Sequence, residues 1–236
     1  KFYTPKNVTT IVVGDFNHDS VLNTLCEKFD FPNRIENENR VNNIDAPVSE
    51  TKYIETKSNV QTGYMMFGWL GPRAAELKDS ICLDLISIIF GDGSSSRLQQ
   101  NLIEKLPEQI FNMIGSEHYQ FKDGNNFFIQ ANFKPEYKEK ALELVKQELA
   151  NLLTNRITEE ELAKAKKRTK SRFAYAAETV SEIGETIGYY VTVCDDLKLI
   201  EDYLAYLDSI TVDDLENAIK KYLSLNNSVI SVLMPE

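Results

Sequence analysis

The stretch Ile89-Phe-Gly-Asp-Gly-Ser-Ser-Ser-Arg-Leu98 contains the end of one predicted helix and the start of the next. The first helix runs from Ala75 to Phe90, because apolar side chains recur there at helical spacing. Its inward-facing residues are Leu77, Ile81, Leu85 and Ile88. Asp84 falls between them, and we expect it to face water. Glycine relieves the left-handed end of a helix, so Gly91-Asp92-Gly93 ends the first one. The serines at 94–96 cap a second helix through Lys105.

Strand patterns lie on both sides of these helices. Residues 51–70 alternate as strand material that breaks near Ser58-Asn59 and stops at Gly71-Pro72. A turn over residues 122–125 separates two further strands, so these two are expected to pair. We predict that one sheet contains four strands, Tyr64–Leu70, Gln109–Tyr119, Asn126–Phe133 and Val229–Leu233. The helix that carries Leu77 is expected to pack on one face of this sheet.

The second half of the chain is mostly helical by pattern. Pro135 suits the first turn of a helix that runs to Leu153. Thr158 and Glu161 form a capping box for a long helix towards Tyr190. In that helix Gly184 and Gly188 stand four residues apart, which either lets another backbone approach closely or only weakens the helix. Two more helices are predicted over 196–207 and 211–223. The order of elements predicts an α+β fold, with a mostly antiparallel sheet and helices packed on one side.

The N-terminal part has its own pattern. The β-branched run Val8 to Gly14 predicts a buried strand, and Asn17 can cap a helix from about His18 to Phe29. Residues 32–49 carry asparagines, prolines and scattered charge without a period, as a linker does. We therefore divide the chain into residues 1–31, the strand and helix at the tail of a preceding domain, a linker over 32–49, and a main domain over 50–236. Because the sequence opens with Lys1, we expect it to be a segment of a longer protein.

Composition excludes some classes of function. The formal net charge of −10 repels phosphate backbones, so we expect no nucleic-acid partner. The three cysteines are far apart and form no C-x-x-C pair, so neither a disulfide framework nor a thiolate metal site is indicated. The most apolar stretch, Tyr64 to Leu70, is too short to span a membrane. The pattern does not choose between the cytoplasm and a periplasmic or organellar compartment, so the localisation is left open.

The sequence offers no complete catalytic or metal-binding motif. Its two histidines, His18 and His118, are a hundred residues apart, and the nearest approach to a zinc motif is Ile114-Gly-Ser-Glu-His118, whose first position cannot bind a metal. No G-x-S-x-G nucleophile elbow is present. The serines at 94–96 lack the lysine of a phosphate-binding loop, so helix capping is the better interpretation. We predict no catalytic residue and no metal ligand in this chain, and we assign no substrate-binding residue.

Four segments together resemble the second, non-zinc domain of the pitrilysin/insulinase-like (inverzincin) zinc metallopeptidases, a family that includes mitochondrial processing peptidase. Their order and spacing, over nearly the whole chain, carry the resemblance. The segments are Phe2–Asp15; Gln61–Pro72; Ile89–Leu98 with Glu104-Lys105; and Ile157–Lys166, followed by Glu178-Thr179 and Ile210–Leu215.

The resemblance implies a clam-shell metalloendopeptidase made of two halves, each of two similar α+β domains of the LuxS/mitochondrial-processing-peptidase type. The halves enclose a chamber for polypeptide substrate. Zinc would bind an inverted H-x-x-E-H motif in the preceding domain, where it activates water. This chain would hold no cofactor and would supply chamber wall and contacts to the second half or partner subunit. The parent would be a hydrolase, and the chain alone would be inactive.

One departure from the family pattern concerns substrate binding. The far half of such enzymes usually offers an Arg and, seven residues later, a Tyr. Here the Arg position is Ile103 and the Tyr position falls at Ile110 or Phe111, and none of these side chains can donate a hydrogen bond. Arg97 lies earlier, and we do not transfer the role to it. Two hypotheses follow: the chain belongs to the zinc-bearing half of an active peptidase, or it comes from a non-catalytic scaffold subunit with the same fold.

Overall fold

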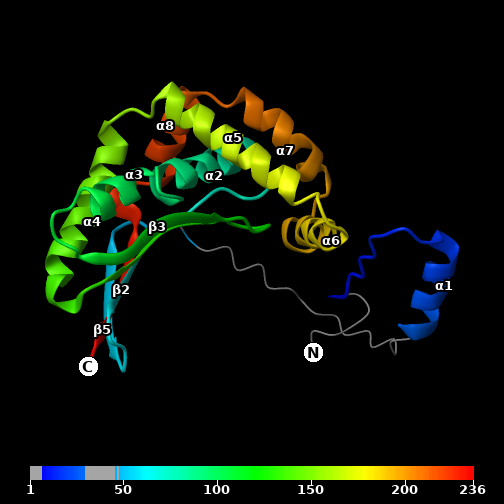
Figure 1. Ribbon diagram of the computed structural model, residues 1–236, viewed down its shortest axis with the longest axis horizontal. Helices are drawn as coiled ribbons and strands as arrows, with labels where there is room; N and C mark the ends of the chain where they lie inside the picture. The colour runs from blue at the N-terminus through cyan, green and yellow to red at the C-terminus, as the bar shows by residue number, and fades with distance from the viewer. Residues whose placement is uncertain (1–6, 30–45, 47) are drawn as a thin grey trace.

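The computed structural model describes residues 7–29, 46 and 48–236. Five strands form one sheet, and a layer of helices covers one of its faces (Figure 1). The strands are β1 (Lys52–Ser58), β2 (Gly63–Leu70), β3 (Phe111–Tyr119), β4 (Asn126–Phe133) and β5 (Val229–Pro235). The α+β class, the shared sheet and the break between β1 and β2 are therefore confirmed.

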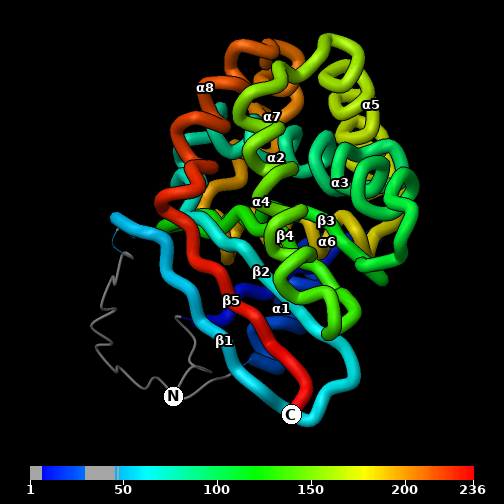
Figure 2. The backbone as a smooth tube through the Cα atoms, turned by 90° about the vertical axis from the view of Figure 1, so that its left-hand side faces the viewer, coloured from blue at the N-terminus to red at the C-terminus, as the bar shows by residue number. Residues whose placement is uncertain are grey.

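The strand order is β1-β5-β2-β4-β3. Neighbouring strands run antiparallel except β1 and β5, which pair in parallel from Lys52 beside Val229 to Ser58 beside Pro235. The strand that comes first in the sequence therefore lies beside the strand that comes last (Figure 2). Antiparallel hairpins need only short turns, whereas this parallel pair is connected through the rest of the domain.

Helix α2 (Leu77–Gly91) is the centre of the core. Its predicted inward residues are buried, but so are Leu83, Ile86 and Phe90, on other sides of the helix. The reason is that α2 contacts β3 on one side and helices on the others, chiefly three of them besides the short α3 (Arg97–Gln99). The three are α5 (Glu159–Tyr175), α7 (Lys198–Ser209) and α8 (Val212–Tyr222). A helix that is apolar all round is expected in such a position.

The remaining elements follow the predicted order. The serine stretch is followed by α3 (Arg97–Gln99), which continues as a π-helical turn, η2 (Gln100–Glu104). Ser96 takes the N-cap position of α3, although its hydroxyl donates to the Gly93 carbonyl instead of capping. The helix expected after Pro135 is present as a 3-10 turn, η3 (Pro135–Tyr137), and α4 (Lys138–Thr154); a second 3-10 turn, η5 (Leu225–Asn227), precedes β5.

The long helix expected from Thr158 towards Tyr190 is interrupted, so this prediction was wrong in its extent. The capping box of Thr158 and Glu161 is present, but α5 ends at Tyr175 and a separate helix, α6 (Val180–Tyr189), follows. The physical cause is a second cap, because the Thr179 side chain accepts a hydrogen bond from the Glu182 amide at 3.2 Å. Helix α6 then passes into a π-helical turn, η4 (Tyr190–Cys194).

The N-terminal part differs from its prediction in one respect. The helix is confirmed as α1 (His18–Lys28), with the Asn17 side chain as its cap. The strand expected over Val8 to Gly14 is not formed, since these residues pair with no strand in the described part of the chain and none is fully buried. A strand needs a neighbour for its amide and carbonyl groups, and no described strand supplies one to this segment. Most of the predicted linker, 32–49, lies outside the described residues.

Helix α1 lies on the opposite side of the sheet from α4 (Figures 1 and 2). It stands apart from the main body, and none of its residues is buried. Among the described residues, no helix is long and apolar enough to cross a membrane.

Gly91 has a second role beyond ending α2. A Cβ atom at this position would lie 2.1 Å from the amide nitrogen of Ser116 and 2.7 Å from the carbonyl carbon of Gly115. Both atoms belong to the backbone of β3, so they cannot move aside as the end of a flexible side chain does. The absence of a side chain at Gly91 therefore sets how closely α2 approaches the sheet.

We predict that Gly91→Ala lowers the free energy of unfolding by about 3 kcal/mol, because the added methyl group overpacks the contact between α2 and β3. Urea denaturation followed by circular dichroism measures the change. Gly124→Ala is the control, since nothing lies within 4 Å of a Cβ built at Gly124. Equal stabilities of the two variants would show that the close approach has no energetic importance.

Candidate functional site

The two histidines lie in different settings. His18 begins α1 with an exposed side chain, and His118 lies on β3 with a side chain that is completely buried. Among the described residues, no group of three or more His, Cys, Asp or Glu side chains is arranged to hold a metal ion. The side chains that could bind zinc in this part of the chain thus do not form a zinc site.

The positions that correspond to the family's Arg and Tyr face the interior. Ile110 and Phe111 are buried, with exposed fractions of 0% and 2%, and Ile103 is half-buried against the core. Their place in the apolar core accounts for their side chains, since a polar group there would need a partner. None of the three is placed to bind a substrate at the surface.

The side chain of Arg97 has a structural role. Its guanidinium donates to both carboxylate oxygens of Glu161, at 2.7 and 2.9 Å, and to the carbonyls of Asn155 and Arg156. Burial alone would raise the pKa of Glu161, but the hydrogen bonds from Arg97 and Thr158 outweigh it and lower that pKa. This bidentate pair joins α3 to the start of α5, which explains the arginine without a role in substrate binding.

Asp84 is the centre of a polar cluster, so the expectation that it faces water holds only in part, with a side chain that is 21% exposed. Its Oδ1 lies 2.6 Å from Nδ1 of His118, and its Oδ2 accepts from Nε2 of Gln120 at 2.8 Å and from the Tyr203 hydroxyl at 2.6 Å. One carboxylate therefore connects α2, β3, the segment after β3, and α7. Because carboxylates only accept, Nδ1 of His118 is the donor in its pair. Burial, followed by the charge of Asp84, raises the pKa of Tyr203 well above its usual value.

The Asp84 cluster borders a cavity of about 410 Å³. An aspartate that orients a histidine is part of a catalytic triad, which also needs a nucleophile on the other ring nitrogen. Here Nε2 of His118 is buried without a partner in the described part of the chain. The cavity's serines point elsewhere, since the Ser87 hydroxyl donates to the Asp84 carbonyl and the Ser116 hydroxyl to the Ser87 carbonyl. Among the described residues, no nucleophile is thus hydrogen-bonded to His118.

The sheet face away from the helix layer, called the open face below, carries exposed apolar side chains. A row across all five strands shows its composition: Ile54 lies beside Ser231, then Met66, Gln130 and Gly115. Ile54 and Met66 are 52% and 44% exposed, although isolated soluble sheets usually place polar residues on a solvated face.

One end of the open face is hollowed. A cavity of about 840 Å³ lies over β2, β4 and β5, and its lining includes Gly68, Phe128 and Val229. The rings of Tyr119 and Phe128 stack at its border, with their centroids 5.3 Å apart. The open face therefore combines exposed aromatic and aliphatic side chains with a concave region. Aromatic side chains and concave apolar regions are both enriched at protein interfaces and binding sites in general.

Comparison with known proteins identifies the family to which this chain belongs. Residues 1–169 match the family described as the peptidase M16 inactive domain. The chain belongs to this family of inactive M16 domains. Zinc protease PqqE of Helicobacter pylori is 28% identical over 249 residues, which cover 99% of this chain and 53% of that protein. This M16 domain therefore spans about half the length of that curated relative.

Solved structures agree on the fold of this M16 domain. A protease from Helicobacter pylori superposes with a TM-score of 0.81 at 24% identity, over 94% of this chain and 54% of that one. The inactive peptidase domain of a zinc protease from Bordetella parapertussis gives 0.68 at 19% identity, over 77% of this chain and 97% of that one. The resemblance to the pitrilysin/insulinase-like peptidases is confirmed, and so is the non-zinc domain type.

We predict that Asp84→Asn destabilises the M16 domain by about 3 kcal/mol, because the NH2 group of asparagine replaces one acceptor oxygen and faces a donor there, either His118 or the pair Gln120 and Tyr203. Chemical denaturation measures the difference. Asp202→Asn is the matched control on α7, where the carboxylate is exposed, and should change stability by less than about 0.5 kcal/mol. A small effect of Asp84→Asn, similar to that of Asp202→Asn, would contradict the role of this cluster.

The three cysteines should differ in reactivity. All are free, with Cys26 exposed and Cys82 and Cys194 buried. Burial raises the pKa of Cys82 to about 12 and also raises that of Cys194, so few thiolates form there at neutral pH. In the native protein at pH 7 we expect Cys26 alone to react rapidly with Ellman's reagent. Denaturation should release the other two, and rapid reaction of Cys82 in the native state would contradict this expectation.

Proposed function

We propose that the chain is the non-zinc domain of an M16 metalloendopeptidase and that its open face forms wall of the chamber that receives polypeptide. The observation that carries the proposal is the exposed apolar and concave surface of the sheet. Extended substrate presents side chains of many types, and aromatic and methionine side chains offer adaptable apolar contacts to them.

Zinc and the general base are assigned to the preceding domain of the parent protein. The described residues of this chain supply no fitting set of ligands, and the chain spans about half the length of its curated zinc-protease relative. The donors that stabilise developing charge on substrate must also come from elsewhere, since Ile103, Ile110 and Phe111 have none. Losing such a donor typically costs about 3 kcal/mol of transition-state stabilisation. We therefore propose a second half or a partner subunit as their source.

Residues 1–31 are proposed to complete the preceding domain. Two observations support this assignment: no strand among the described residues lies beside the β-branched segment before Gly14, and α1 packs none of its residues into the core. An apolar strand and an amphipathic helix without a core are expected to find one in a neighbouring domain. The main domain then begins near residue 50, just before β1.

The alternative function is a scaffold subunit with the same fold and no catalysis in its parent. The M16 fold supports both, because fold alone does not determine activity. The sequence that precedes Lys1 in the natural protein discriminates between them. An H-x-x-E-H motif on a predicted helix there favours the peptidase, and its loss favours the scaffold.

The purified 236-residue chain should hold no tightly bound zinc and should not cleave peptides. Two separated histidines and the lack of a ligand cluster in the described part of the chain are the reason. Elemental analysis after a chelator wash checks the metal, and a fluorogenic peptide library checks cleavage. About one retained zinc ion per chain would contradict the assignment of the metal to the preceding domain.

Met66→Asp tests the chamber wall. In the assembled enzyme we expect a loss of peptide turnover of roughly tenfold, about 1.4 kcal/mol, because a charge replaces apolar contact with substrate. Stability should change little, as Met66 is 44% exposed. Tyr206→Asp on α7 is the control, since Tyr206 is 45% exposed on the helical side of the molecule. Equal turnover of both variants and the wild type would contradict the proposed wall.

A further inference from the structure

Helix α6 is weakly attached to the domain that contains it. None of its ten residues is buried, and Val180 and Tyr189 are exposed by 55% and 38%. Its one described side-chain hydrogen bond to the sheet region runs from the Tyr189 hydroxyl to the Gln120 carbonyl. A helix with little burial in its own domain is expected to pack against something else.

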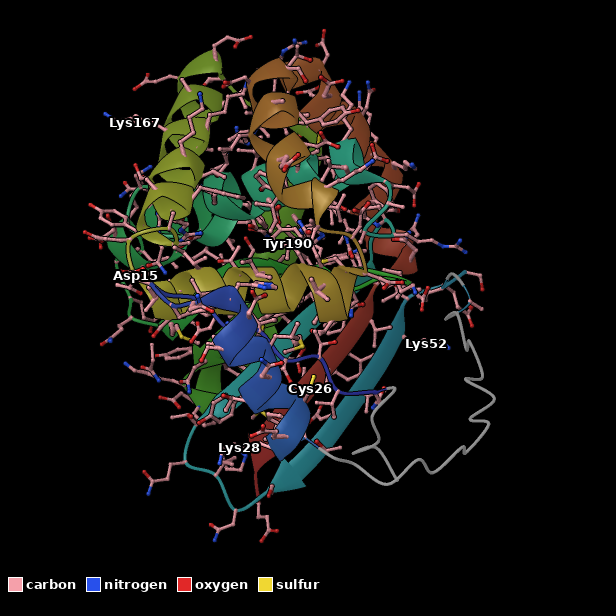
Figure 3. The ribbon with its side chains drawn as sticks, turned by 90° about the vertical axis from the view of Figure 1, so that its right-hand side faces the viewer. Asp15, Cys26, Lys28, Lys52, Lys167 and Tyr190 are labelled. Carbon is pink, nitrogen blue, oxygen red and sulfur yellow. The ribbon has the colours of Figure 1, made fainter. Side chains whose placement is uncertain are left out.

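The N-terminal segment lies against the glycine face of α6. A Cβ atom at Gly188 would lie 3.3 Å from Cδ1 of Ile11, and one at Gly184 would lie 3.8 Å from Cγ2 of Val13. Residues four apart share one face of a helix, so Gly184 and Gly188 form one continuous contact surface for the N-terminal segment. This surface is called the seat below. Figure 3 shows the segment that leads to Asp15 running along α6, with Tyr190 at the end of that helix. Gly184 and Gly188 thus let another backbone approach.

The segment that contacts α6 is extended like a strand but is not paired with a described strand. Ile11 and Val13 are half-buried, whereas Thr10 and Val12 are exposed, which is the alternation of an extended chain. Within the described part of the chain, residues 8–13 make no backbone hydrogen bond. With respect to the described residues, both edges of the segment are therefore open to strand pairing, while one of its faces is covered by α6.

We propose that α6 is a domain-crossing helix: it belongs to this domain by sequence and covers the last strand of the preceding domain's sheet. Gly184 and Gly188 form its seat for Ile11 and Val13. This inference rests on the proposed assignment of residues 1–31 to that domain. It goes beyond the assignment by naming the surface that joins the two domains, and it assigns a partner to a helix that its own domain leaves uncovered.

Thiol cross-linking tests the seat in a Cys26→Ser background, which removes the exposed native thiol. Ile11→Cys combined with Gly188→Cys should cross-link efficiently with a short bismaleimide, because the shorter side chain at position 11 leaves room for the new thiol. Ile11→Cys with Glu182→Cys is the control, since Glu182 is exposed on a different face of α6. Equal yields from the two pairs would overturn the seat.

Gly188→Leu provides a second test. Leucine favours a helix over glycine, so α6 itself should not unravel. The larger side chain should instead displace the segment and raise the labelling rate of a Val13→Cys thiol several-fold. Glu182→Leu, which places the same side chain on another face, should leave that rate unchanged. An unchanged rate in the Gly188→Leu protein would overturn the proposal.

Hydrogen exchange of residues 8–13 separates this inference from the domain assignment. In the protein that carries its preceding domain, these amides should be protected by strand pairing. Protection without cross-linking of positions 11 and 188 would leave the domain assignment standing and overturn the seat. Cross-linking without protection would show that α6 covers no strand of a neighbouring sheet, and it would overturn both the assignment and the domain-crossing role.

Discussion

The carboxylate of Asp84 is the constraint on which the arrangement of this domain depends. It projects from the most buried helix, and three side chains from other parts of the fold donate to it. The Asp84 side chain is only 21% exposed, and its hydrogen bonds to His118 and Tyr203 hold α2, β3 and α7 in one geometry. Gly91, at the end of the same helix, fixes the remaining distance to the sheet. Apolar packing supplies most of the stability, whereas this polar cluster selects a single packing among many.

Much of the fold follows from local patterns in the sequence. The strands, α2, α4, α8 and the capping box at Thr158 were predictable because alternation, helical spacing and caps act over a few residues. The hydrogen bonds of Asp84 were not predictable. Its position between inward-facing residues does not reveal the histidine and the tyrosine that approach it from other elements. The break after Tyr175 had a local signal, Thr179 three residues before Glu182, but the surrounding helical pattern hid it.

The site was less predictable than the fold, for a physical reason. A catalytic motif can be recognised in a sequence by rare residue types at a fixed spacing. This sequence contains no such motif. Its candidate surface consists of ordinary residues such as Ile54, Met66 and Phe128, which become a continuous face only when five strands align in register. The sequence showed that these residues alternate, but not that their side of the sheet would lack a helix layer. The resemblance to a family indicated the type of domain, which local sequence patterns cannot indicate.

The parallel pairing of β1 with β5 has a consequence for how the domain is made. β5 lies between β1 and β2 in the sheet. Neither β1 nor β2 can therefore pair with β5 until residues 229–235 have emerged from the ribosome. Until then β2 presents an apolar open edge, of the kind that recruits other chains into aggregates. Contacts between such distant segments also form slowly. A ribosome that stalls before residue 229 would therefore release a sheet that is still divided, with β1 held by no neighbour at all.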